Sequence, residues 1–522
     1  MSWQAIGQRA QNAVLESIPA RWKLNPRQYS DLTDVTHIPY ECGLMTKDQL
    51  AITELTVIEL LDLLKLREVK ASEVLEAFAA RAAIAHQLTN CLTEWFFEDG
   101  LQRANELDEA FANSGKLQGP LHGIPIALKD AHEIAGHAVT MGYVARKDNI
   151  ARRDSNLIET LRNAGAIFFC KTTMPQSGMA LETVSNLWGR TTNPYNRNLG
   201  AGGSSGGDSV LVAMRGSPIA PSTDMGGSIR VPAAFNGLYG IRPTSDRIPK
   251  GGMQSTNGGN LTIKLSCGPV CHSLQDLELF TRVINSHPNH QYDVTSVPVP
   301  WRELGALGRK LAIGIMKWDG VVMPHPPVLR ALEHTKKVLK RDGHEGSSTT
   351  EATLKASGEP IIPAFAELLR IFDPQAKSAA EALQLNIHTR FLKEKFAEAW
   401  DRTADKTTTG RTIDALILPP APGVGYPHDF NLYWGYTSLF NLVDYPSVIL
   451  PILNFKVDPE RDVLDEQYSP LDTNPFDKLN YELYNPEMFM NQPSTIQIVG
   501  RPFEDEEIIR VASILDDLFQ TP

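Results

Sequence analysis

The chain has 522 residues, of which 42% are hydrophobic and 21% are charged, a composition typical of globular proteins. Its 61 acidic and 50 basic side chains give a formal net charge of −11, which disfavours broad electrostatic attraction to nucleic-acid phosphates or to an anionic membrane. We therefore expect a small-molecule or protein partner and no nucleic acid.

The cysteines and the N-terminal sequence indicate the cellular compartment in which the protein works. The cysteines are odd in number and lack CxxC spacing, which disfavours a disulfide framework and a zinc ribbon; they are Cys42, Cys91, Cys170, Cys267 and Cys271. The first 25 residues lack the basic start and apolar core of a signal peptide, and no run approaches the roughly 18 apolar residues of a membrane span. These features predict a soluble, cytoplasmic protein without a membrane span.

Helical and strand patterns alternate along the chain. After a polar N-terminal arm over residues 1–50, Thr56 and Glu59 form a capping box ahead of apolar residues at helical spacing. A second helix is expected after Ser72. Short apolar runs bounded by proline, glycine or charge predict strands, and these lie at 124–128, 166–170, 311–316, 415–419, 447–453 and 495–499.

Helices are expected between these strands. One begins at Asp154 or Ser155 and stops at Gly165, and another covers 326–343, with proline at its start and Gly343 at its end. The alternation predicts an α/β protein. No repeat or long Gly/Ser linker divides the chain, so we expect one large domain over 1–522, with the proline- and acid-rich stretch 458–490 as a surface insertion.

Glycine and serine are concentrated between residues 200 and 244. This segment contains "GGSSGG", with Ser204 and Ser205, and "DMGGS", which ends at Ser228. It lacks the lysine of a phosphate loop, and the polar loop before it is not the strand that a GxSxG elbow requires. One interpretation is a flexible loop. The other is a backbone nest, in which successive glycines let N–H groups converge on an oxyanion while Ser228 attacks a carbonyl.

A serine nucleophile needs a base. His122, His132, His137 and His428 lie in separate contexts, and the spacing of "HEIAGH" does not match the HExxH zinc motif. Lys129 ends a strand pattern, where burial can lower its pKa from about 10.4 enough for it to accept a proton. The local pattern alone favours the alternative, a solvated lysine paired with Asp130.

Together these segments resemble the amidase signature family, most closely its fungal acetamidase-like branch. Residues 202–244 are similar to the signature block and "GPLHGIPIALKD", from residue 119, to the lysine block, so that 119–245 forms the signature core. "YWGYTSLFNLVDYP", from Tyr433, resembles fungal members, and the similarity covers almost the whole chain. The resemblance implies a single domain whose mixed central sheet is covered by helices on both faces.

It also implies the chemistry. Ser228 would be the nucleophile of a catalytic triad, Lys129 would be its base, and Ser204, in a cis peptide bond, would be the residue that bridges them. This triad would hydrolyse a small or aryl amide through an acyl-enzyme, without metal or cofactor. The other site residues that it implies are Met225, Gly226 and Gly227 for the oxyanion, Ser177 and Gly178 for the substrate pocket, and Ser205, Asp224 and Arg230 as supporting residues.

Two departures and several alternatives remain. Residues 220–222 read "APS" where many members have GxG, which leaves the local backbone path open, and Gly178 stands where lipid-cleaving relatives often have a larger residue, which predicts a different acyl-chain preference. Trp434, Tyr436 and Tyr445 belong either to the pocket or to the core.

Two alternative functions remain for the chain. One is a glutamine-dependent amidotransferase subunit, and the other is a non-catalytic binding protein. The resemblance also allows a homodimer.

Overall fold

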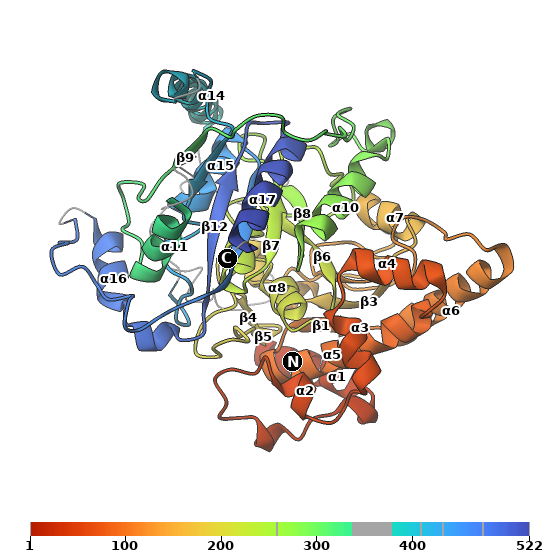
Figure 1. Cartoon of the computed structure of the whole chain (residues 1–522). Helices are drawn as coiled ribbons and strands as arrows, with labels where there is room; N and C mark the ends of the chain where they lie inside the picture. The colour runs from red at the N-terminus through yellow and green to blue at the C-terminus, as the bar shows by residue number, and fades with distance from the viewer. Residues whose placement is uncertain are drawn as a thin grey trace.

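The computed structural model describes residues 2–256, 259–336, 378–407, 410–430, 433–471 and 474–520. A ten-stranded mixed sheet runs through the molecule in the order β1-β3-β2-β6-β8-β7-β11-β12-β10-β9 (Figure 1). Strand β2 is parallel to β3 and β6, and β9 is parallel to β10, whereas the other neighbours are antiparallel. The strands of this sheet are β1 (Leu92–Trp95), β2 (Pro125–Lys129), β3 (Ile167–Thr172), β6 (Ile219–Asp224), β7 (Tyr239–Arg242), β8 (Ser266–Cys271), β9 (Ile313–Ile315), β10 (Ala415–Leu418), β11 (Ser447–Lys456) and β12 (Pro493–Val499), and a separate hairpin consists of β4 (Val184–Ser185) and β5 (Gly189–Arg190).

Helices cover both faces of this sheet, as the alternation of side chains along β11 demonstrates. Val448 and Leu450 belong to the same apolar cluster as residues of α17, whereas Ile449 between them packs in a second cluster with residues of α9. In Figure 1, α17 lies across the sheet beside β12. The α-helices are α1 (Trp3–Ser17), α2 (Ile38–Glu41), α3 (Lys47–Glu54), α4 (Val57–Leu66), α5 (Ala71–Thr89), α6 (Phe97–Ser114), α7 (Asn156–Asn163), α8 (Gly206–Ala213), α9 (Arg230–Phe235), α10 (Leu274–Asn285), α11 (Pro326–Lys336), α14 (Ala379–Asp401), α15 (Gly435–Val443), α16 (Pro475–Leu483) and α17 (Asp505–Gln520).

The α/β class is confirmed, and the six predicted strands are β2, β3, β9, β10, β11 and β12. The capping box at the start of α4 is present, since Thr56 Oγ1 accepts from Glu59 N at 3.3 Å and Glu59 Oε2 accepts from Thr56 N at 2.8 Å. Helix α5 begins at Ala71, before the predicted start, because Asp108 of α6 accepts from the N–H groups of Ala71 and Ser72. The predicted end of the helix at 326–343 lies outside the described residues.

The central strand β6 was not predicted. Its sequence, "IAPSTD", contains Pro221, which cannot donate to a sheet ladder, yet residues 220–222 pair with β8, with Pro221 opposite Pro269. This settles the path of the "APS" segment, which is a buried strand. Because β6 is also the parallel neighbour of β2, the carboxyl ends of these two strands lie side by side.

The N-terminal segment contributes to the core. Within the first 50 residues, α1 and the chain after it bury Ala10, Val14, Ile18 and Trp22 in the main apolar cluster. None of the helices in the described ranges is both long enough and apolar enough to span a membrane.

Candidate active site

Three segments bring predicted site residues together at the carboxyl ends of β2 and β6. Lys129 is the last residue of β2, and Ser204 and Ser205 immediately precede α8. Ser228 lies in the turn between β6 and α9. In α/β sheets this edge commonly binds ligands, because loops from neighbouring strands converge there.

Lys129 is fully buried among hydroxyl groups. Its Nζ donates to Ser204 Oγ at 2.8 Å, to Ser205 Oγ at 2.7 Å and to Thr223 Oγ1 at 2.8 Å. Thr223, in β6, was not among the predicted site residues. Within the described ranges, no carboxylate forms an ion pair with Lys129, so the alternative prediction of a solvated Lys129–Asp130 pair is wrong. Asp130 instead lies 3.5 Å from Lys171 Nζ, since successive side chains at a strand end point in opposite directions.

This environment makes the neutral amine of Lys129 more accessible than that of an exposed lysine. Burial lowers the pKa of Lys129 to about 8, while the more distant Asp208 and Asp224 oppose that shift. Burial also raises the pKa of Asp208, whose carboxylate accepts from Thr172 Oγ1 and, at 2.7 Å, from Ser222 Oγ. A lysine with a pKa near the physiological range can both accept and return a proton.

The glycine–serine loop passes close to neighbouring backbone. The peptide bond between Gly203 and Ser204 is cis. A Cβ atom at Gly203 would lie 2.6 Å from Ala180 O, and one at Gly207 would lie 2.4 Å from Thr173 N, so neither position has room for a side chain. Ser205 N donates to Ser228 O at 3.1 Å. The glycines therefore allow close packing, which contradicts the interpretation of a flexible loop.

Asp224 organises the turn that carries Ser228. Its carboxylate accepts from the N–H groups of Gly227 at 2.9 Å and Ile229 at 3.0 Å, and it forms a fully buried ion pair with Arg230 at 2.9 Å. Burial opposes ionisation of Asp224, but Arg230, Asn441 and the Ile229 N–H hold its pKa well below the usual value. The Gly227 N–H thus points to Asp224. In the part of the chain that the structure describes, the N–H groups of Gly226 and Ser228 have no protein acceptor.

Helix α15 packs against the turn that carries Ser228 and stabilises it. Thr437 Oγ1 donates to Gly226 O at 2.7 Å, and Asn441 Nδ2 donates to Asp224 Oδ1 at 2.8 Å. The Trp434 ring packs against Gly226, where a Cβ would lie 2.8 Å from it. Nothing in the sequence around 434–441 indicates these roles, because all the partners are more than 200 residues away.

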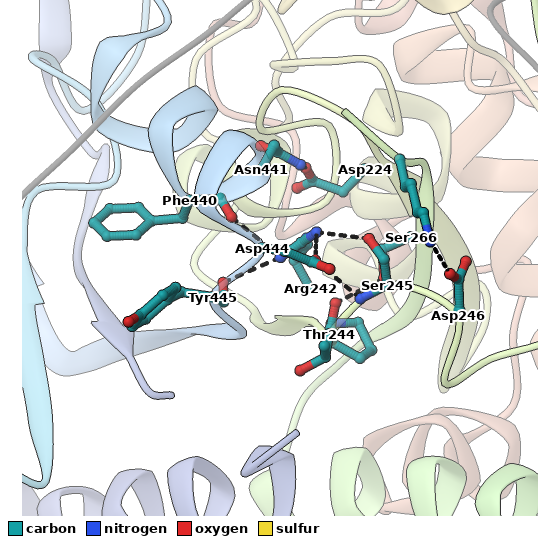
Figure 2. A network of polar contacts seen from close by, with 12 residues as sticks. Asp224, Arg242, Thr244, Ser245, Asp246, Ser266, Phe440, Asn441, Asp444 and Tyr445 are labelled. Atoms are coloured by element: carbon teal, nitrogen blue, oxygen red, sulfur yellow. Dashed lines mark hydrogen bonds and ion pairs between the residues drawn. The ribbon is translucent and has the colours of Figure 1, made fainter. Parts of the chain in front are cut away.

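Arg242, the last residue of β7, holds the other end of α15 (Figure 2). Its guanidinium donates to Phe440 O at 3.2 Å and to Tyr445 O at 3.1 Å, and it pairs with Asp444 at 2.5 Å. A cation at the end of a helix satisfies the last carbonyl groups and complements the helix dipole. The turn at Ser228 is therefore supported by a helix that is fixed at both ends.

A small cavity of about 30 Å³ opens beside Ser228 and Ser204. Its volume is that of about two water molecules. Ser177 and Gly178, both with positive φ, lie on its wall. Polar side chains of Thr223, Gln254, Ser255 and Thr256 also line it. Four methionines provide most of its apolar lining, and these are Met141, Met174, Met179 and Met225. Thioether side chains adapt their shape, so this wall can adjust to a small acyl group.

The three aromatic residues near α15 separate into two groups. Tyr436 is buried and donates to Val322 O at 2.7 Å, and Tyr445 packs against Trp400 and Phe396, so both belong to the core. Trp434 packs with the methionine cluster that includes Met225.

Comparisons with known proteins identify the family of the chain. The model of the family described as Amidase matches residues 73–357. An amidase of Gibberella zeae is 60% identical over the full length of both chains. An acetamidase of Emericella nidulans is 36% identical over 98% of this chain and 97% of the relative. A solved fatty acid amide hydrolase superposes with a TM-score of 0.92 at 29% identity, covering 99% of this chain and 95% of the other. The chain belongs to the amidase family, and it is an amidohydrolase that acts on C–N amide bonds.

Proposed function

We propose that this enzyme hydrolyses a small carboxylic amide through a triad of Ser228, Ser204 and Lys129. The observation that supports this most strongly is the set of three hydroxyl partners around the buried Lys129 Nζ. An ammonium has three donors and no acceptor, whereas a neutral amine has two donors and one lone pair. The neutral amine can therefore donate to two of the hydroxyls and accept a proton from the third.

Ser204 is the hydroxyl best placed to donate. The Ser205 hydroxyl donates to Thr223 O at 3.3 Å, so Ser205 accepts from Lys129. Ser204 lines the cavity together with Ser228, and the adjacent Ser205 N–H binds Ser228 O. In this proposal the proton of Ser228 passes through Ser204 to Lys129, while Ser205 and Thr223 keep the amine in place.

The reaction follows in two steps. Ser228 Oγ attacks the amide carbonyl, and the N–H groups of Gly226 and Ser228 receive the developing oxyanion. Gly227 and Met225 belong to the same turn, but the Gly227 N–H serves to orient it through Asp224. The C–N bond then breaks as Lys129, through Ser204, returns the proton to the leaving nitrogen. Water, deprotonated by the same route, attacks the acyl-enzyme and releases the acid and free Ser228.

The size of the cavity supports a short acyl group. About 30 Å³ beside Ser228 does not admit a long chain without movement of the methionines, and one relative is an acetamidase. A glutamine-dependent amidotransferase subunit is the second candidate. No charged side chain is among the described residues that line this cavity, so the ammonium and carboxylate of glutamine would have no ion-pair partner there, and hydrolysis of an uncharged acyl amide is the better supported function.

A fluorophosphonate labelling experiment tests the proposal and does not require the substrate to be identified first. We expect intact mass to show one adduct on the wild type, none on Ser228→Ala, and an adduct on Ser205→Ala, whose hydroxyl is assigned no chemical step. Absence of an adduct on folded wild-type protein, or an unchanged adduct on Ser228→Ala, would refute the nucleophile assignment. Release of ammonia from glutamine at a higher kcat/KM than from acetamide would favour the second candidate.

A further inference from the structure

A second, outer pocket lies next to the cavity at Ser228. It is open, has a volume of about 680 Å³, and is lined by the loop from residue 145 to 153 together with Glu133, Val139 and Gln254. Gln254 lines both spaces, since it also belongs to the wall of the inner cavity. Its backbone N–H donates to Ala131 O at 2.9 Å and its side chain donates to Glu133. Gln254 therefore separates the two spaces in a defined position.

A further contact links the outer pocket to the inner cavity. Arg146, in the outer pocket, directs its Nη1 to Met141 Sδ at 3.4 Å, and Met141 lines the inner cavity. The Arg146 guanidinium also lies over the Tyr143 ring, 5.5 Å from its centroid. The outer pocket is thus contiguous with the wall of the inner cavity and lies where a substrate longer than the inner cavity would extend.

The outer pocket is positively charged, although the chain as a whole is acidic. Arg146, Arg152 and Arg153 line it, and Glu133 is the only acidic side chain among its lining residues. Over the ranges that the structure covers, none of these three guanidiniums forms an ion pair. Neighbouring charges are already matched, since Lys147 pairs with Asp148 in the same loop and Arg162 of α7 pairs with Asp154. Three unpaired guanidiniums at one concave surface attract an anion.

We infer that this pocket selects amides that carry a negative charge on the amine side of the scissile bond. The inference rests on the proposed function, because it extends the same active site. Among the described residues that line the inner cavity there is no arginine or lysine, so a carboxylate on the acyl side would be left without an ion-pair partner there, and the acyl end is uncharged. The charged group therefore belongs to the leaving amine, which extends past Gln254 to the arginines. N-acylated amino acids and aminobenzoates have this chemistry.

Two acetanilides provide the test. One is 4-acetamidobenzoate, and the other is its neutral counterpart with a methyl ketone in place of the carboxylate. The readout is the ratio of kcat/KM for the anionic probe to that for the neutral probe. The protection that each probe gives Ser228 against fluorophosphonate labelling provides a second ratio, that of the binding affinities of the two probes, which does not depend on turnover.

Three variants define the expected outcome. Arg152→Gln/Arg153→Gln lowers the ratio about fivefold, because each exposed ion pair contributes modestly. Glu133→Gln, which removes the opposing carboxylate, raises it. The matched control Arg27→Gln/Arg402→Gln removes two charges from exposed positions outside the pocket and leaves the ratio unchanged. Raising the ionic strength lowers the wild-type ratio towards that of the arginine variant.

An unchanged ratio in Arg152→Gln/Arg153→Gln, with Ser228 still labelled, would overturn this inference and leave the proposed function intact. A loss confined to a probe with its carboxylate on the acyl side, such as succinanilate, would overturn the assignment to the amine side. A folded wild type that neither labels nor hydrolyses the probes would instead reject the proposed function itself.

Discussion

Two fully buried lysines on neighbouring strands have opposite surroundings. Lys171 of β3 lies 3.5 Å from a carboxylate of Asp130 and donates to the carbonyl oxygens of His132, at 3.2 Å, and Ala138. Lys129 of β2 has three hydroxyl partners and, in the described ranges, no ion pair. Burial lowers the pKa of both side chains.

The difference lies in what the partners require. Carboxylate and carbonyl oxygens only accept, so the surroundings of Lys171 require an ammonium that donates to all of them. Hydroxyl groups donate or accept, so the surroundings of Lys129 suit both protonation states. Burial alone therefore does not identify a proton-accepting lysine, and the chemistry of its partners does. This difference supports our proposal that Lys129, and not Lys171, is the catalytic lysine.

The largest expected effect is on activity, in Lys129→Ala. Loss of a general base typically costs 10²–10⁴-fold, so we expect kcat to fall about a thousandfold while the protein stays folded. Amide hydrolysis and thermal unfolding, measured on the same preparation, check this. A variant that unfolds at a much lower temperature but retains its specific activity would make Lys129 the structural lysine.

Lys171→Met is the converse change. It leaves the Asp130 carboxylate buried without its cation, and we expect the free energy of unfolding to fall by about 3–5 kcal/mol, with kcat within a few fold of wild type. Without Lys171 the folded-state pKa of Asp130 lies above its unfolded value, so the folded state binds the proton more tightly. The destabilisation therefore decreases as the pH is lowered towards about 4. Denaturant melts at pH 5 and pH 8 measure this, and equal losses at both values would contradict the ion-pair account.

Thr223→Val tests the contribution of one of the three hydroxyl partners of Lys129. It removes an acceptor that stabilises the ammonium of Lys129 more than the amine, so we expect the pKa of Lys129 to fall. The amine also loses one of the partners that hold it in place, so we expect kcat/KM on the high-pH plateau to decrease about tenfold. The midpoint of the pH–rate profile then moves to lower pH. Ser209→Ala is a matched control, since that buried hydroxyl has no partner in the described residues. If the midpoint stayed in place, Thr223 would have only a packing role.

Gly178→Ala is expected to have the smallest effect. At φ +77° any side chain is strained, and the new Cβ would lie 2.8 Å from Met174 Cε. The acyl cavity becomes narrower, so we expect the kcat/KM ratio of butyranilide to acetanilide to fall about threefold, on the order of the effect of one or two methylenes. An unchanged ratio would remove Gly178 from the determinants of acyl-chain length.

Part of this account could be predicted from the sequence. Lys129 ends a strand that its apolar run predicts, and Ser204 and Ser228 lie in long ordered motifs, so these residues were identified and the structure places them in one site. Thr223 was missed, because "IAPSTD" does not have the pattern of a central strand. The support from Asn441 and Arg242 was missed because it depends on contacts between residues about 200 positions apart, which local spacing does not encode.

The most direct test of the central claim is the pH dependence of Ser228 phosphonylation by a fluorophosphonate, followed by intact mass in the wild type and in Lys129→Ala. If neutral Lys129 activates Ser228, the wild-type rate rises with pH and levels off above the Lys129 pKa of about 8, whereas the rate in Lys129→Ala is low and lacks that inflection. A profile that keeps the same inflection in Lys129→Ala would show that another group is the base.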